Sequence, residues 1–265
     1  MSRFDEFSVV DEITLNQVRQ RLQLSAADLG PEIVSFRAVP GAKGTAFVVL
    51  TPLLAFALLL LPGVTVGTFE VTMAVVVWLL AQLALGAFWI RGWLERHRVC
   101  RHGLVLGRRG EYAVPWSTID PGRVRLLRRA NLLTRHGIAA GRLLRPGETL
   151  GHALLVNGLD DTPAGHERLA VNEQLLREGR GADEHLTCFD RWVLAGRHAP
   201  DLVRAMEEAM VADGYPAQGM AAEVVAHPLV LAWTPQPDAS GIPGEHLSPL
   251  RRTTDPVIGT RAARA

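Results

Sequence analysis

The residues that most often carry chemistry are present in this sequence, but their spacing forms no metal-binding motif. The chain has nine histidines. His97 and His102 are five residues apart, across a predicted strand and its turn, so we do not expect them to share a face. His166 and Glu167 stand together without the second histidine that a zinc-binding helix supplies. We therefore predict no metal site.

Other catalytic signatures are also missing from the sequence. There is no Gly-x-Ser-x-Gly elbow and no dinucleotide fingerprint. The stretch PGAKGTA, residues 40–46, lacks the Gly-Lys-Ser/Thr ending of a phosphate loop. Asp160 and Asp161 form a carboxylate pair, but they follow a predicted strand end and are interpreted as a solvated turn. We predict a protein that is not an enzyme, with no catalytic residues and no cofactor.

The charge is segregated along the chain, although the formal net charge is only +1. Residues 91–145 carry 13 arginines against three acidic residues, and residues 146–265 carry 10 basic against 17 acidic groups. A single lysine, Lys43, accompanies the arginines, a bias typical of GC-rich bacterial genomes. Such segregation favours a partner that presents a large surface of one sign.

Anionic lipid headgroups are the partner predicted for this basic stretch. Nucleic acid is disfavoured because no exposed aromatic residues alternate with the arginines. Two other interpretations stay open: the arginines set membrane topology, or they pair with the acidic groups of residues 146–265. The predicted headgroup contacts are Arg98, Arg101, Arg108, Arg109, Arg123, Arg125, Arg128 and Arg129.

Two apolar runs precede the basic stretch. Thr45–Leu61 has no charge, Phe69–Ile90 has only Glu70, and a Gly/Pro-rich turn separates them. Each run is long enough to cross about 30 Å of hydrocarbon at roughly 1.5 Å per residue. We therefore predict a transmembrane hairpin over residues 45–92. Basic residues flank the runs and not the turn, which places the protein in the inner membrane with both termini in the cytoplasm.

The remaining sequence divides into three segments. Residues 1–44 contain an amphipathic helical pattern around 14–24. Residues 95–215 alternate short strand-like runs with turns and end in an amphipathic helix, while an insertion at 160–185 predicts a further helix. Residues 216–265 are rich in proline and glycine towards their end, and we predict an extended or flexible tail.

The stretch CRHGLVLGRRGEYAVPWSTID, Cys100 to Asp120, resembles the first strands of bacterial pleckstrin-homology-like (PH-like) domains. The shared elements are a Gly-Leu-x-Leu strand, a short glycine-bounded turn and a Val-Pro-Trp-x-x-Ile element. The resemblance implies a membrane α-helical hairpin followed by a cytoplasmic, β-rich α+β domain, a PH-like barrel with a C-terminal helix. It also implies that Trp116 lies under the barrel as a core residue.

These observations predict a non-catalytic inner-membrane protein. Its PH-like domain acts as a binding or scaffolding module seated on anionic lipid, and an unknown protein partner is possible. The alternative is an accessory subunit of a larger membrane complex, which uses the hairpin as its interaction surface.

Overall fold

The protein is an α+β structure with two four-stranded sheets, as seen in a computed structural model. The model describes residues 12–39, 68–130, 152–179, 189–194 and 196–231, with isolated positions 46, 50, 51, 53, 54, 57, 132 and 233. The mixed α+β composition predicted from the sequence is confirmed. All that follows concerns these residues.

The first sheet is antiparallel, in the order β1 (Glu32–Arg37), β2 (Arg96–Cys100), β3 (Gly103–Leu106) and β4 (Tyr112–Pro115). Strands β2 to β4 follow one another through tight turns, as the punctuation of the sequence predicts. Strand β1 comes from the N-terminal segment and pairs with β2, so 1–44 contributes to the same domain.

The second sheet contains β5 (Arg125–Arg128), β6 (His152–Leu159), β7 (Phe189–Leu194) and β8 (Leu229–Val230). Its order is β7-β6-β5-β8, and only the short pairing of β5 with β8 is parallel. Strands β4 and β6 lie against each other and join the two sheets.

The main core lies between these sheets and helix α5 (Ala199–Ala212). Trp116, in the 3₁₀ turn after β4, is 0% exposed, and its indole N–H donates a hydrogen bond to the carbonyl oxygen of Arg101 at 3.0 Å. The prediction that Trp116 is a core residue is confirmed. Helix α5 turns the apolar stripe of its sequence inward: Leu202, Val203, Met206 and Met210 are buried, and Val211 is partly buried against them.

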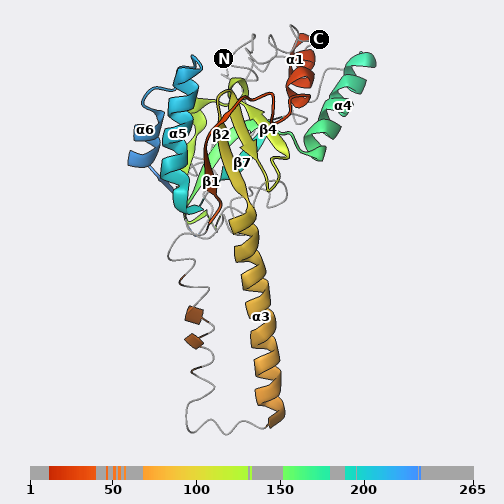
Figure 1. The fold of residues 1–265 in the computed structure, drawn as a ribbon. Coiled ribbons are helices and arrows are strands. Elements are labelled where there is room, and N and C mark those ends of the chain that lie inside the picture. The colour runs from red at the N-terminus through yellow and green to blue at the C-terminus, as the bar shows by residue number, and fades with distance from the viewer. Residues whose placement is uncertain are drawn as a thin grey trace.

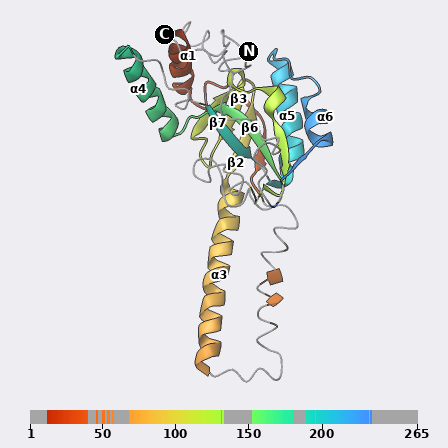
Figure 2. The same cartoon turned by 180° about the vertical axis from the view of Figure 1, so that it is seen from behind.

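Two helical pairs flank the sheets. Helices α1 (Glu12–Leu22) and α4 (Pro163–Arg177) lie side by side on one flank, and α5 lies beside α6 (Met220–Ala226) on the other (Figure 1, Figure 2). Helix α4 falls in the insertion at 160–185. Helices α4 and α1 bury apolar residues against each other. Each helix covers the apolar face of the other, which would be exposed if that helix stood alone.

The Asp160–Asp161 pair is not the solvated turn that the sequence suggests. Asp160 is 0% exposed and forms a short ion pair with Arg168. Its carboxylate also accepts hydrogen bonds from the backbone N–H and the hydroxyl of Thr162, at the start of α4. This buried carboxylate therefore fixes α4 to the end of β6, because a charge out of water is stable only when it is paired.

Helix α6 and strand β8 lie within the stretch predicted as an extended or flexible tail. Met220, Ala221 and Val224 of α6 are buried in the main core. The proline and glycine residues that suggested a tail begin only at Pro235, beyond β8. The described chain up to Leu231 thus belongs to the domain.

Helix α3 (Thr68–Leu94) is 27 residues long and extends away from the sheets, and it continues into β2 (Figure 1). Within the part of the chain that the structure describes, no helix combines the length and apolar content needed to cross a membrane. This finding contradicts the transmembrane hairpin over 45–92. The membrane keywords, the two-span integral membrane partner and the inner-membrane location, all of which rested on the hairpin, are corrected with it.

The physical reason lies in what the hairpin prediction assumed. It took two apolar runs and treated both as helices that span a bilayer. Phe69–Ile90 lies within helix α3, which over its described residues is not long and apolar enough to span a membrane, and most of Thr45–Leu61 lies outside the described residues. The predicted hairpin was also the reason for placing the arginines within reach of anionic lipid headgroups. That reason is removed together with the hairpin.

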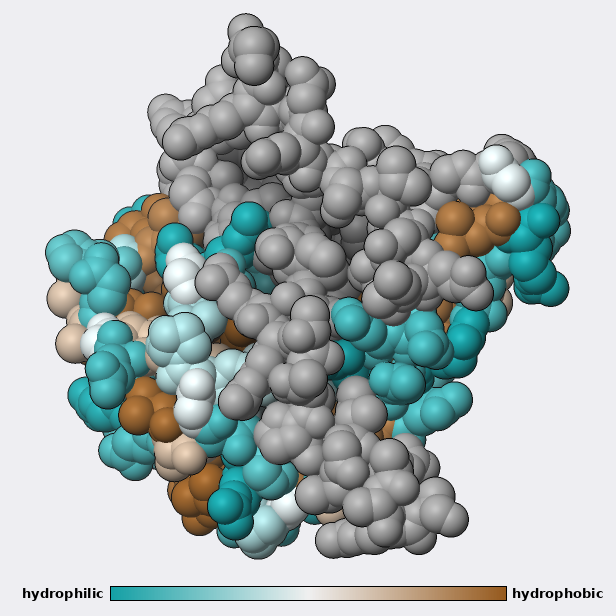
Figure 3. Space-filling model, turned by 90° about the horizontal axis from the view of Figure 1, so that it is seen from above, coloured by the Kyte–Doolittle hydropathy of each residue, from teal (hydrophilic) through white to brown (hydrophobic). Residues whose placement is uncertain are grey.

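Seen from the end opposite α3, the described surface is mainly hydrophilic. Figure 3 shows hydrophilic residues on the flank of α4 and on the flank of the α5–α6 pair, with smaller hydrophobic patches among them. Amphipathic helices that cover a core on one side expose this kind of surface on the other.

Candidate anion-binding surface

Three arginines of the first sheet share its outer face. Strand pairing places Arg37 opposite Arg96 and Ser35 opposite Arg98, and residues two apart on a strand point to the same side. The opposite side of β2 carries buried Val99 of the main core. With Arg108 and Arg109 of the turn between β3 and β4, these three arginines form what we call the arginine face.

The turn Gly107–Gly110 displays two of these arginines. Both glycines have positive φ angles, 97° and 76°, which favour glycine because it has no Cβ. The N–H of Gly110 donates to the carbonyl oxygen of Gly107 at 3.3 Å, which closes the turn. Arg108 and Arg109 are exposed at its tip. A Cβ on Gly110 would lie 3.5 Å from Nη1 of Arg98, so the Arg98 guanidinium packs beside the turn.

Glu111 partly occupies the anion-binding position of this turn. Its Oε2 accepts a hydrogen bond from the backbone N–H of Arg109 at 3.0 Å. The same oxygen lies where a Cβ on Gly107 would clash with it. A carboxylate held by a backbone N–H between two arginines stands in for an external anion. An external oxyanion would have to displace the Glu111 carboxylate from the N–H of Arg109.

Arg98 has unused hydrogen-bonding capacity. Its Nε is buried and has no hydrogen-bond partner, and the nearest carboxylate oxygen, on Glu32, is 3.8 Å away. A buried donor without a partner costs free energy that a ligand oxygen would recover. The charge of Arg98 also acts on its neighbour Cys100. Burial raises the pKa of the Cys100 thiol to about 11; the carboxylate of Glu32 adds to this rise, and Arg98 opposes it. That thiol is protonated at neutral pH and is no nucleophile.

Arg37 joins the arginine face to α3. Its guanidinium lies 3.9 Å from the ring centroid of Trp93, near the end of that helix. Arginine over an indole face is attracted by the ring quadrupole. This contact fixes the side chain of Arg37, so we assign it to positioning α3 against the sheet.

The other predicted contacts lie apart from the arginine face. Arg101 is exposed at the opposite end of β2, beyond the Cys100–Gly103 pair. Arg123 lies 3.5 Å from a carboxylate oxygen of Asp120. Arg125 donates from Nη1 to the carbonyl oxygens of Gly122 and Val124, both at 2.8 Å. Their cations are used by their own loop.

Arg128 and Arg129 belong to the second sheet. Both are exposed at the end of β5, and Arg129 has a φ angle of 60°. The structure thus gathers three of the eight predicted contacts, Arg98, Arg108 and Arg109, into one surface. Arg96, which is exposed beside Arg98, and Arg37, which positions α3, lie on the same surface but are not among the predicted contacts. Strand alternation in 96–100 predicts the place of Arg96 beside Arg98, but the position of Arg37 depends on the pairing of β1 with β2.

Comparison with known proteins adds no relative. No family model matches the chain, and no curated protein and no solved structure is similar to it. The resemblance to PH-like domains therefore stays a prediction. In the described ranges, no three His, Cys, Asp or Glu side chains are grouped so that they could hold a metal ion.

Proposed function

We propose that the protein is a non-catalytic binding module that takes phosphate-bearing ligands on the arginine face. The observation that carries the proposal is the exposed pair Arg108–Arg109 on a glycine turn beside Arg98. No described carboxylate forms an ion pair with the side chain of Arg96, Arg108 or Arg109. Arginines that only balance nearby acids would be paired; among the described residues these three are not, whereas Arg98 lies 3.8 Å from a carboxylate oxygen of Glu32.

Phosphate fits this surface by charge and by geometry. The guanidinium group presents parallel N–H donors that match two oxygens of a phosphate. Each charge-assisted hydrogen bond contributes about 1.5–3 kcal/mol when it is formed in a partly desolvated site. Exposed arginines are screened, because the Debye length falls from about 10 Å at 0.1 M salt to about 3 Å at 1 M. Binding should therefore weaken steeply with salt.

The test is calorimetric titration of the full chain with inorganic triphosphate at low salt. Changing Arg108 and Arg109 to Ser removes two exposed charges from the turn and should weaken binding at least tenfold. The matched control changes Arg177 and Arg204 to Ser; both are exposed and lie on α4 and α5, away from the arginine face. Equal losses in both double variants would reduce the effect to net charge, and no binding by the unaltered chain would refute the proposal.

A second arm identifies the source of the phosphate. The full chain is mixed with vesicles that contain phosphatidic acid and with vesicles of phosphatidylcholine alone. Sedimentation with the first kind only, lost in R108S/R109S, would assign the surface to lipid phosphates. Triphosphate binding without sedimentation would assign it to a soluble phosphate-bearing ligand.

The exposed apolar side of α3 favours a second candidate function, an accessory subunit that contacts a partner protein through this helix. Large apolar side chains on α3 are 43–70% exposed: Val76, Leu79, Leu80, Leu83 and Ile90. Exposed apolar groups at such spacing mark interaction surfaces. A stoichiometric protein that co-purifies with the full chain, and is lost when Leu80 and Leu83 become Gln, would favour this candidate over the first.

A further inference from the structure

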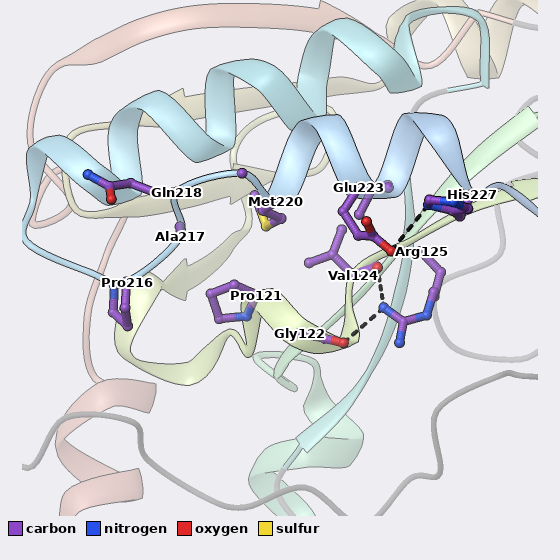
Figure 4. Close-up of a pocket in the computed structure, with 12 residues that line it drawn as sticks. Pro121, Gly122, Val124, Arg125, Pro216, Ala217, Gln218, Met220, Glu223 and His227 are labelled. Atoms are coloured by element: carbon purple, nitrogen blue, oxygen red, sulfur yellow. Dashed lines mark hydrogen bonds and ion pairs between the residues drawn. The ribbon is translucent and has the colours of Figure 1, made fainter.

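A pocket of about 530 Å³ opens between the start of β5 and helix α6 (Figure 4). One wall is the loop from Pro121 to Arg125, and the other is the segment from Pro216 into α6. The volume lies inside the range of roughly 300–1,000 Å³ that small-molecule sites occupy. The pocket belongs to the second sheet, and none of its lining residues is part of the arginine face.

The floor of the pocket is formed by residues of the main core. Val124, Ala217, Met220 and Val224 line it, and all four are at most 6% exposed. Pro121 and Pro216 stand on its two sides (Figure 4). Prolines have no backbone N–H, so these two positions of the wall present no backbone donor. An apolar ligand group placed here would extend the core.

The charged groups of the lining and His227 lie together on one side of the pocket, whereas Gln218 lies near Pro216. Figure 4 shows Arg125, Glu223 and His227 on the side away from Pro216. Nη1 of Arg125 is fixed by the carbonyl oxygens of Gly122 and Val124, so the guanidinium is held at the pocket without its remaining N–H groups being used in any described hydrogen bond. Glu223 is engaged by Nδ1 of His227, 3.2 Å from its Oε1.

We infer that this pocket binds a small amphipathic organic anion, a carboxylate or sulfonate on an apolar or aromatic body. The body lies on the floor formed by Met220 and Val224, and the anionic head accepts hydrogen bonds from Arg125. An anion is favoured over a cation because Arg125 is permanently charged and held in place by two carbonyl oxygens, whereas the one carboxylate of the lining, that of Glu223, is 73% exposed to water. An inorganic anion would leave the apolar floor unused.

Proton–nitrogen NMR titrations of the full chain with 1-naphthoate test the inference. The cationic isostere 1-naphthylmethylammonium is the matched ligand control, because it has the same ring system and the opposite charge. Naphthoate should give saturable shifts at the amides of Gly122–Arg125 and of Gln218–Val224. The ammonium compound should leave them unchanged. Equal shifts with both compounds, or shifts confined to α3, would overturn the inference.

Two variants assign the head group. Arg125→Gln should weaken naphthoate binding at least fivefold, while Arg123→Gln, in the same loop but outside the pocket lining, should change it less than twofold. Equal affinities in these two variants contradict the role of Arg125. A melting curve is recorded for each variant. If Arg125→Gln does not fold, Arg125→Lys takes its place: it keeps the charge without the fork and should bind naphthoate more weakly than the unaltered chain. Because the arginine face is not involved, R108S/R109S should bind naphthoate as the unaltered chain does.

Discussion

Four of the five arginines of the arginine face come from the same basic stretch, residues 91–145, as the Asp120–Arg125 loop, yet the two regions use their arginines in opposite ways. At the turn between β3 and β4, Arg108 and Arg109 are exposed and unpaired among the described residues. In the loop before β5, Arg123 faces Asp120, and Arg125 donates to two carbonyl oxygens. One region displays its charges, and the other uses them to hold its own backbone.

The difference lies in the neighbours and not in the arginines. Gly107 and Gly110 adopt the φ angles of their turn without strain, and the carboxylate at that turn, on Glu111, accepts from the backbone N–H of Arg109 without a described ion pair to either arginine side chain. Asp120 instead caps a 3₁₀ turn: its Oδ1 accepts from the N–H of Gly122 at 2.8 Å. The carboxylate that accepts this hydrogen bond also pairs with the nearest cation, Arg123. A run of arginines therefore indicates a binding surface only where nearby carboxylates do not pair with it.

The largest expected effect concerns the core beneath both regions. Trp116 lies under the end of β4, just before the Asp120 loop. Trp116→Ala should lower the free energy of unfolding by about 3–5 kcal/mol, the usual loss for a buried large aromatic side chain. Chemical denaturation of the full chain measures it. Trp233→Ala, at a tryptophan that is 64% exposed, is the control, and equal losses in the two variants would contradict the core position of Trp116.

A change at Asp120 separates the braced loop from the arginine face. Asp120→Ala removes the acceptor for the N–H of Gly122 and the partner of Arg123, and should cost about 1–2 kcal/mol of unfolding free energy. Asp120→Asn keeps an oxygen acceptor and should cost less. R108S/R109S should change stability by no more than about 0.5 kcal/mol, as exposed substitutions usually do. If that double variant destabilises the chain as much as Asp120→Ala, its arginines are also structural.

Part of this arrangement is predictable from the sequence. The turn at Gly107–Gly110, the strands on either side of it and the buried Trp116 follow from local punctuation and alternation. The apolar stripe of α5 follows from helical periodicity. These features depend on residues close together in the chain.

The remainder depends on contacts that local patterns do not encode. Strand β1 pairs with β2 across more than fifty residues, which brings Arg37 opposite Arg96. Helix α1 packs on α4, where Arg19 and Glu173 form an ion pair at 2.7 Å. Asp160 looks like a surface acid in the sequence. In the structure it is buried and forms an ion pair with Arg168 of α4. The transmembrane hairpin fails for the related reason that it was derived from composition along single runs.

Removing Glu111 should sharpen the contrast between the two regions. Glu111→Gln takes away the internal anion of the turn but leaves an oxygen that can accept from the N–H of Arg109. Triphosphate affinity should rise about threefold, which corresponds to about 0.6 kcal/mol. The same titration measures it. The counterpart Asp120→Asn removes a loop charge and should leave triphosphate affinity unchanged. A fall in affinity for Glu111→Gln would show that this carboxylate orders the turn for binding instead of competing.

The smallest expected effect concerns Asp161, an acid beside the first sheet that the arginine face does not neutralise. Burial raises the pKa of Asp161, against hydrogen bonds from the N–H of Ala113 at 2.8 Å and from His166. A folded pKa above the unfolded one means that the folded chain binds the proton more tightly. The contribution of Asp161 to stability is therefore full below about pH 4 and is lost as the pH rises through the raised folded value.

Asp161→Asn should accordingly raise the free energy of unfolding at pH 7 by a few tenths of a kcal/mol and flatten its decline above about pH 4. The amide oxygen still accepts from the N–H of Ala113, so the contact with β4 is kept. Urea denaturation from pH 3.5 to pH 7 measures both effects, and a loss of stability at pH 7 would contradict the assignment. Because His166 is the side-chain partner of Asp161, R108S/R109S should leave this pH dependence as it is. If the double variant shifts the pH dependence, the charges of Arg108 and Arg109 act on Asp161 at the start of α4. The arginine face is then not electrostatically separate from the part of the domain whose charged groups pair with one another.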